Sequence, residues 1–291
     1  MVGRVVACYG AHLMVREAQG REVVCRFRGR LRRDAGDTGG VVIGDMVEVQ
    51  DRGGELLVDK VLPRRNLLDR PAVANVDQVL VVFAWAEPPL DLEHTARVMA
   101  VAERAGVRPL AVLNKVDLMT EAQLEDARRL FSPQPYPFFL TSAATGAGVD
   151  QLRVVLPDKV TVLAGVSGVG KSCLLNALRP GLSLRTGELS ARLGRGRHTT
   201  RLARLVEVGR GMVADTPGFS RLDLTGVRPG EVGKLFPEME SRAGDCRFPD
   251  CLHRAEPECA VRDAVAHGLI AQWRYDTYLK LLAESEEQRP W

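Results

Sequence analysis

The 291-residue sequence contains no apolar run of the roughly 18 to 20 residues that a membrane-spanning helix needs. Its longest apolar run, residues 79–86, has the length of a buried strand. The N-terminus also lacks the basic and then apolar pattern of a secretion signal. We therefore expect a cytoplasmic protein that does not associate with membranes.

The net charge is only +3, so the overall charge does not indicate a class of partner. The arginines, however, are unevenly distributed. Seven lie between Arg179 and Arg204, together with a single Glu. A second set lies near the N-terminus, at Arg21, Arg26, Arg28, Arg30, Arg32 and Arg33. Because the guanidinium group binds phosphate in a bidentate manner, both sets indicate nucleic-acid contacts. The alternative is a solvated surface with acidic neighbours.

The pattern of apolar residues changes twice along the chain. In residues 1–68, five short apolar or alternating runs separated by turn residues predict a small β-barrel of the OB type, a platform for RNA. Residues 64–74 read as a linker. From there to residue 229, predicted strands alternate with predicted helices, as in an α/β domain with a parallel sheet. Residues 230–291 comprise a loop-rich, cysteine-containing segment and a predicted helical tail.

A phosphate-binding motif follows the predicted strand at 159–164. The sequence Gly-Val-Ser-Gly-Val-Gly-Lys-Ser matches the P-loop pattern between a strand and a helix, where backbone N–H groups close around phosphate oxygens. Lys171 is expected to reach the β- and γ-phosphates, and the Ser172 hydroxyl to bind Mg²⁺. The predicted phosphate-site residues are Gly165, Val166, Ser167, Gly168, Val169, Gly170, Lys171, Ser172 and Cys173.

A second motif, Asn-Lys-Val-Asp, follows another predicted strand and indicates guanine as the base. The Asp117 carboxylate can accept hydrogen bonds from guanine N1–H and the exocyclic amine, a donor pair that adenine lacks. Asn114 would tie this loop to its neighbours, and the Lys115 stem would cover the base. After the next strand, the Ala143 N–H is expected to donate to guanine O6. The predicted base-site residues are Asn114, Lys115, Val116, Asp117, Ser142 and Ala143.

Two further loops carry residues that would sense the γ-phosphate. In Asp215-Thr-Pro-Gly218, Asp215 is expected to bind Mg²⁺ through water and the Gly218 N–H to contact the γ-phosphate. A Gly/Arg-rich loop ends in His198-Thr-Thr, and we predict Thr200 as the second Mg²⁺ hydroxyl, with Thr199 as the alternative.

Hydrolysis of GTP depends on positioning and charge neutralisation. Phe219 stands where Ras-like enzymes carry the glutamine that orients water, and Phe cannot orient water. We therefore predict slow intrinsic turnover that needs another group or a partner. His198 is the candidate, although it would also suit RNA contact or an exposed loop. The predicted catalytic residues are Lys171, His198, Thr200, Asp215 and Gly218.

Three of the six cysteines lie close together near the C-terminus. With a neighbouring histidine they form a Cys₃His set, a usual composition of structural zinc sites: Cys246, Cys251, His253 and Cys259. Such a loop-rich segment has little core, so the metal would supply folding energy of order 10 kcal/mol. The alternative is unrelated cysteines beside a chance histidine. His267 lies too far along the chain to be preferred.

The order of the nucleotide motifs differs from that in Ras-like GTPases, where the P-loop comes first. Here N-K-V-D and T-S-A precede the P-loop, yet each loop still follows a strand, so a circular permutation can rebuild the same cradle. With the 194–200 loop and the cysteine cluster, these motifs make the chain resemble the RsgA family of bacterial circularly permuted GTPases. The resemblance spans essentially the whole chain. It implies an OB fold, zinc, a role in late maturation of the small ribosomal subunit, and a GTPase stimulated by that subunit.

We therefore predict a multidomain protein: an OB-type barrel at 1–68, a circularly permuted α/β P-loop GTPase domain at 69–229, and a zinc-binding module with helices at 230–291. The predicted cofactors are GTP or GDP, Mg²⁺ and one Zn²⁺. The predicted partners are the small subunit and its rRNA, and the protein is expected to be a monomer. A P-loop kinase with a zinc lid is one alternative, which N-K-V-D opposes. A non-catalytic RNA-binding protein with a structural GTP site is another, which the intact Lys171, Ser172 and Asp215 oppose.

Overall fold

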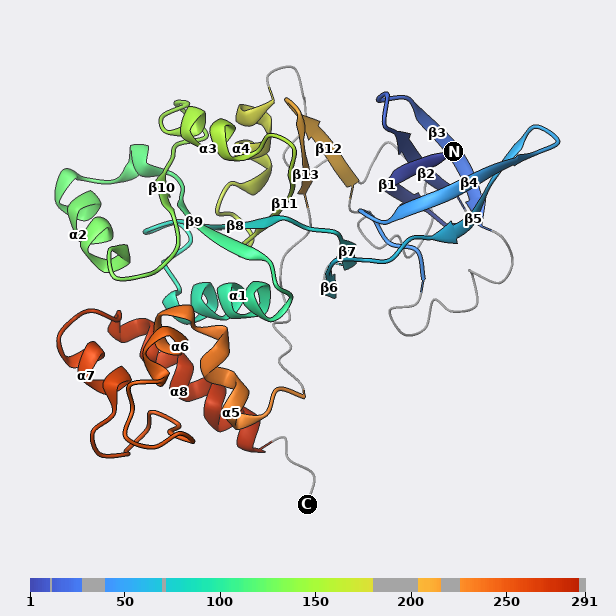
Figure 1. The fold of residues 1–291 in the computed structure, drawn as a ribbon. Helices are drawn as coiled ribbons and strands as arrows, with labels where there is room; N and C mark the ends of the chain where they lie inside the picture. Colours follow the sequence, from blue (N-terminus) through green and yellow to red (C-terminus); the bar gives the residue numbers. More distant parts are fainter. Residues whose placement is uncertain (11, 28–39, 70–71, 180–203, 216–225, 288–291) are drawn as a thin grey trace.

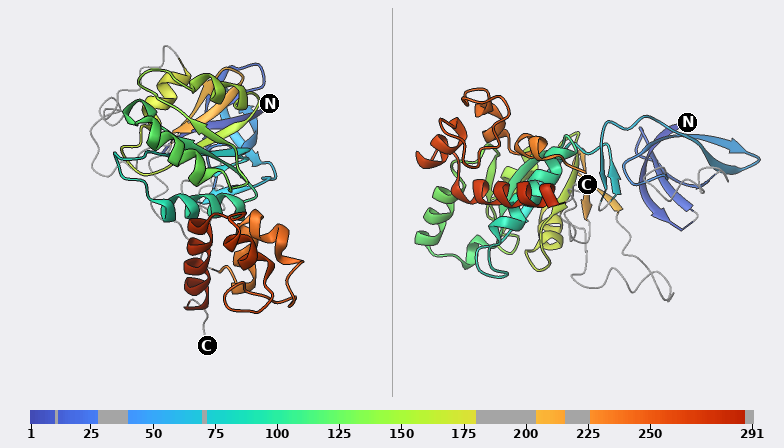
Figure 2. Two further views of the ribbon diagram at one scale, coloured as in Figure 1. Left: turned by 90° about the vertical axis from the view of Figure 1, so that its left-hand side faces the viewer. Right: turned by 90° about the horizontal axis from the view of Figure 1, so that it is seen from below.

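The computed structural model of the chain describes residues 1–10, 12–27, 40–69, 72–179, 204–215 and 226–287 (Figure 1). A β-barrel, a central α/β unit and a C-terminal helical module follow one another along the chain. The barrel lies at one end of the central sheet, and the helical module packs below α1 (Figures 1 and 2). None of the helices in the described ranges is long and apolar enough to cross a membrane.

The N-terminal barrel has five strands: β1 (Val2–Tyr9), β2 (His12–Glu17), β3 (Glu22–Phe27), β4 (Met46–Arg52) and β5 (Glu55–Val61). All neighbours are antiparallel except β3 and β5, which run parallel, and β1 pairs with β4 to close the barrel. Inward-facing side chains such as Leu13, Val15 and Val58 are fully buried. This five-stranded closure confirms the predicted OB-type barrel.

The central sheet has the strand order β10-β9-β8-β11-β13-β12. The strands are β8 (Gln78–Phe83), β9 (Arg108–Leu113), β10 (Phe138–Leu140), β11 (Val160–Ala164), β12 (Arg204–Val208) and β13 (Gly211–Asp215). All pairs are parallel except β12 with β13. The nucleotide motifs are permuted along the chain, but their strands are close in space. The Asn-Lys-Val-Asp motif follows β9 and the phosphate loop follows β11, and only β8 lies between these two strands.

Helices cover both faces of this sheet: α1 (Leu92–Arg104), α2 (Glu121–Phe131), α3 (Val149–Val155) and α4 (Lys171–Leu178). The two faces form separate cores. Val79, Val81 and Phe83 of β8 pack in one core with α1 and α2, and Leu80 and Val82 pack in the other with α3 and α4. A strand buried on both faces needs a continuous apolar sequence. This is the physical reason for the long apolar run at β8, and it confirms the predicted α/β domain.

The barrel joins the central unit through the edge strand β12. β1 pairs with β12 at Ala7 and Arg204, so one sheet continues from the GTPase-like unit into the barrel. Two ion pairs lie at this junction, Arg16–Glu207 at 2.7 Å and Arg204–Glu22 at 3.1 Å. The segment predicted as a linker contains a short hairpin, β6 (Leu67–Asp69) and β7 (Ala72–Ala74).

The C-terminal module is helical on both sides of the cysteine cluster: α5 (Pro229–Val232), η2 (Gly233–Leu235), α6 (Pro237–Ala243), α7 (Ala260–Ala266) and α8 (Gln272–Glu287). The predicted single helical tail is interrupted at Gly268, whose φ of +70° ends α7. Arg274 of α8 is fully buried and pairs with Glu238 at 2.6 Å. The Trp273 indole donates to the Leu130 carbonyl at 3.2 Å, so α8 is held against the central unit.

Candidate functional site

The predicted phosphate loop joins the end of β11 to the first residue of α4. Its glycines are required by close approaches. A Cβ on Gly165 (φ +138°) would lie 2.0 Å from the Val82 carbonyl oxygen, and one on Gly170 (φ +96°) would lie 2.4 Å from Asn114 Nδ2. Lys171 Nζ donates to the carbonyls of Gly165 and Val166 at 2.8 and 2.9 Å. The ammonium group therefore lies over the loop that is predicted to hold phosphate.

The buried amide of Asn114 joins three of the predicted nucleotide loops. Its Nδ2 donates to the Val169 carbonyl at 2.8 Å, and its Oδ1 accepts from the Ala143 N–H at 3.1 Å and the Thr141 hydroxyl at 3.2 Å. Asn114 is only 1% exposed. The side chain thus fixes the base loop, the phosphate loop and the Thr141–Ala143 segment in one arrangement, as the sequence predicts.

The base loop turns sharply after β9. Lys115 adopts a left-handed conformation (φ +66°) and precedes the short helix η1 (Val116–Leu118). The Val116 N–H donates to the Thr141 carbonyl at 3.1 Å, and Lys115 Nζ donates to the Glu87 carbonyl at 2.6 Å. Asp117 is exposed beside this turn. A carboxylate at the open end of the loop is therefore available to a ligand.

The residues predicted to sense the γ-phosphate are only partly described. Asp215 is the last residue of β13, and its backbone pairs in register with Leu163 at the end of β11. Strand β13 thus ends beside the strand that leads into the phosphate loop. His198, Thr199, Thr200, Gly218 and Phe219 lie outside the described residues.

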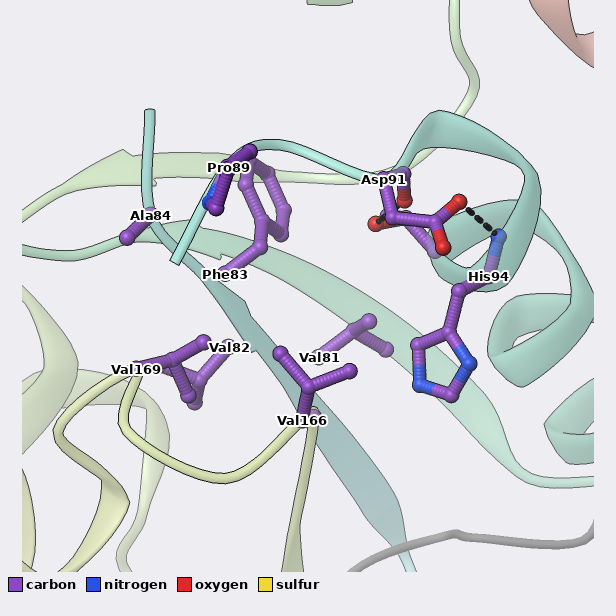
Figure 3. Close-up of a pocket in the computed structure, with 11 residues that line it drawn as sticks. Val81, Val82, Phe83, Ala84, Pro89, Asp91, His94, Val166 and Val169 are labelled. Atoms are coloured by element: carbon purple, nitrogen blue, oxygen red, sulfur yellow. Dashed lines mark hydrogen bonds between the residues drawn. The ribbon is translucent and has the colours of Figure 1, made fainter. Parts of the chain in front are cut away.

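A small cavity beneath the phosphate loop is lined by His94, a residue that the sequence analysis did not assign to the site. The cavity, of about 10 Å³, lies between β8, the start of α1 and the loop, and its lining includes Val81, His94 and Val166 (Figure 3). Burial lowers the pKa of His94, and the charges of Arg97 and Lys171 lower it further. The helical spacing of α1 in the sequence does not show which of its polar side chains turns towards the loop.

The cysteine cluster is assembled as predicted. The ligand atoms of Cys246, Cys251, His253 and Cys259 all lie within 4.8 Å of one another. His253 Nδ1 lies 3.5 Å from Cys246 Sγ and 3.4 Å from Cys259 Sγ. Hydroxyls of two tyrosines on α8 hold the loop, because Tyr275 donates to the His253 carbonyl at 2.7 Å and Tyr278 donates to that of Leu252 at 2.5 Å.

The donor groups of this cluster fit a metal centre, whose positive charge would stabilise the thiolates. Burial lowers the pKa of His253, which favours the neutral imidazole that binds metal. Burial and the neighbouring thiols raise the pKa of Cys251 to about 12. Three thiolates this close together need a cation to offset their charge. The donor set and its spacing match those of a structural zinc site.

Comparison with known proteins identifies the family. A family profile described as RsgA GTPase matches residues 61–225. The chain belongs to the RsgA GTPase family. It is 47% identical, over 98% of its length and 97% of the relative's, to the small ribosomal subunit biogenesis GTPase RsgA of Moorella thermoacetica. Its identity to the corresponding Bacillus pumilus protein is 39%, over 99% and 98% of the two chains.

Two solved structures have the same fold as this chain. YjeQ from Thermotoga maritima matches with a TM-score of 0.84 at 37% identity, covering 99% of each chain. YloQ, described as a circularly permuted GTPase, matches with a TM-score of 0.81 at 30% identity, covering 100% of this chain and 96% of that one. These likenesses confirm the predicted fold class and family.

Membership in the RsgA family makes the chain a GTP hydrolase, as predicted, with GTP or GDP and Mg²⁺ as its cofactors. The kinase and the non-catalytic RNA-binding protein are not supported. The role of each individual residue stays a prediction.

Proposed function

We propose that this GTPase acts in the biogenesis of the small ribosomal subunit, in late maturation, and hydrolyses GTP to GDP and phosphate with stimulation by the subunit. The names of its relatives, small ribosomal subunit biogenesis GTPases, support a role in this process. The observation that carries the nucleotide site is the buried Asn114 amide, which joins its own loop to two others by hydrogen bonds although the order of the three loops in the chain is permuted. We propose that the protein acts in the cytoplasm, where the small subunit matures in bacteria.

The proposed nucleotide site has a base end and a phosphate end. At the base end, the Asp117 carboxylate accepts from guanine, the Lys115 stem covers the ring, and the Ala143 N–H donates to O6. At the phosphate end, the N–H groups of residues 165–173 surround the phosphates. Lys171, whose ammonium already lies over two carbonyls of this loop, neutralises phosphate charge.

Ser172, at the second position of α4, is proposed to hold Mg²⁺ together with Thr200 and, through water, Asp215. When bound, the ion neutralises phosphate charge in the transition state. Gly218 is proposed to contact the γ-phosphate. Because Phe219 cannot orient water, we assign that role to His198 and propose that contact of its arginine-rich segment with rRNA stimulates the reaction.

The remaining parts of the chain are proposed to bind rRNA and zinc. We propose three domains, at 1–68, 69–229 and 230–291, in a protein that acts as a monomer. The barrel and the arginine-rich segment 179–204 are proposed to contact rRNA. Arg26 is exposed on the barrel surface, although it also pairs with Glu55 at 2.8 Å. The cysteine cluster is proposed to hold one Zn²⁺ that stabilises the C-terminal module.

GTP turnover, measured with and without purified small subunits, tests this function. We expect slow turnover alone and faster turnover with subunits, together with a preference for GTP over ATP. Lys171→Ala should abolish turnover under both conditions. His198→Ala should bind GTP normally and lose the stimulated turnover, whereas His267→Ala, an exposed substitution on the C-terminal module, serves as the matched control. Turnover that subunits do not change would overturn the proposal, and a preference for ATP would favour a kinase.

A further inference from the structure

His94 lies in the first turn of α1, directly beneath the phosphate loop. Its backbone N–H donates to the Asp91 side chain at 2.8 Å, and its imidazole ring points into the cavity towards Val166 (Figure 3). The cavity of about 10 Å³ has room for a single water molecule. The ring therefore lines a cavity that the phosphate loop also lines.

The Nε2 atom of His94 is buried, and no described residue lies within hydrogen-bonding distance of it. Leaving a buried polar atom without a hydrogen-bond partner is unfavourable. A neutral ring tolerates this position better than a charged one, since burial lowers the pKa of His94. Burial of the ring therefore favours the neutral imidazole.

The described charges around the ring come from two helices. Asp91 on α1 favours the protonated ring, whereas Arg97 on α1 and Lys171 on α4 oppose it. Strand β8 contributes Val81, Val82, Phe83 and Ala84 to the cavity, none of which titrates. From α8, Glu284 pairs with Arg97 and Lys280 pairs with Glu93, so these two charges are largely balanced.

Lys171 belongs both to this electrostatic environment and to the phosphate site. When a nucleoside diphosphate binds, its negative charge arrives on the loop above His94 and offsets the ammonium charge that opposes protonation. An opposite charge near a titratable group favours its charged form, most strongly within about 4–6 Å, and burial strengthens the interaction.

From this geometry we propose that His94 couples nucleotide binding to proton uptake, which rests on the nucleotide site proposed above. The protonated fraction of the ring increases as phosphate groups occupy the loop, with the protons coming from the buffer, and Nε2–H then donates into the cavity. Release of the nucleotide returns the proton to the solvent. His94 acts as a positioning residue, because it supports the loop and does not touch the reacting atoms.

The coupling has a measurable consequence. If binding raises the pKa of one group by between half a unit and one unit, affinity increases by about threefold to tenfold as the pH falls through that range. We therefore expect GDP to bind more tightly at pH 6 than at pH 8 through His94, by less than about tenfold, beyond any change that comes from the nucleotide's own phosphates.

Isothermal titration calorimetry of GDP with Mg²⁺, in two buffers of different ionisation enthalpy at pH 6.5, counts the protons taken up. His94→Gln keeps hydrogen-bonding capacity but cannot take up the proton, and His94→Leu fills the space with an apolar side chain. His267→Gln is the control, because that histidine is exposed on α7, far along the chain from the loop. Protonation of the GDP phosphates is common to all four proteins and cancels in the differences.

The proposal predicts that wild type and His267→Gln take up more protons than both His94 variants. It also predicts that both His94 variants lose the part of the increase in GDP affinity at low pH that comes from His94. Equal proton uptake by wild type and His94→Gln would overturn it, and this comparison remains valid if His94→Leu fails to fold. A wild-type protein that does not bind GDP even at pH 8 would instead refute the nucleotide site.

Discussion

Replacement of Asn114 by alanine tests how far one side chain holds the permuted loops together. The amide makes three hydrogen bonds of 2.8 to 3.2 Å in a site that is 1% exposed. At about 1 kcal/mol per bond, the direct loss is about 3 kcal/mol. The Val169 carbonyl and the Ala143 N–H also lose a partner, which places the decrease in the free energy of unfolding at about 3–4 kcal/mol.

The variant should also bind GDP at least tenfold more weakly, since tenfold corresponds to about 1.4 kcal/mol and both ends of the proposed site depend on this amide. Denaturant unfolding and GDP calorimetry measure the two effects. Thr141→Val is the graded control, because it removes a hydroxyl that lies 3.2 Å from Asn114 Oδ1 and leaves the amide in place. Its free energy of unfolding should decrease by about 1 kcal/mol. An Asn114→Ala protein with unchanged stability and GDP affinity would refute the reasoning.

Two further predictions concern the C-terminal module. Cys259→Ser should lower the zinc content, measured by atomic absorption, from one ion per chain, and should expose the 246–259 loop to protease. Cys173→Ser on α4 is the control and should leave the zinc content unchanged. Equal zinc content in the two variants would contradict the assigned ligands. Arg274→Met should reduce the free energy of unfolding by about 3–5 kcal/mol, because it leaves the buried Glu238 carboxylate without a partner, and Arg274→Met with Glu238→Met should recover most of this loss. A single variant as stable as wild type would show that the pair does not hold α8 in place.

The parts of the site that follow local rules could be predicted from sequence. The glycines of 165–170 indicate the phosphate loop, and at Gly165 and Gly170 the backbone lies too close to another chain segment for a side chain. The cysteine cluster could be predicted because its four ligands lie within one short segment. In both cases spacing along the chain determines proximity in space.

Features that depend on packing between distant elements could not be predicted. Arg274 has the sequence character of an exposed helical residue, yet it is fully buried against Glu238, 36 residues away. His94 lies in an amphipathic helix whose sequence does not reveal the cavity above it. Helices α5 and α6 were missed within a segment read as loop-rich, because their few turns are stabilised by the core around Phe236 and Met239.

The central claim is that loops in a permuted order form one guanine-nucleotide site, and the base specificity of Asp117 tests it most directly. An asparagine at this position would accept from N1–H and donate to the O2 of xanthine, whereas a carboxylate donates nothing. Affinities for GDP and XDP should therefore be measured for wild type and Asp117→Asn. The account predicts that wild type strongly prefers GDP and that the variant prefers XDP. An unchanged preference for GDP in Asp117→Asn would show that the loop at 114–117 does not read the base.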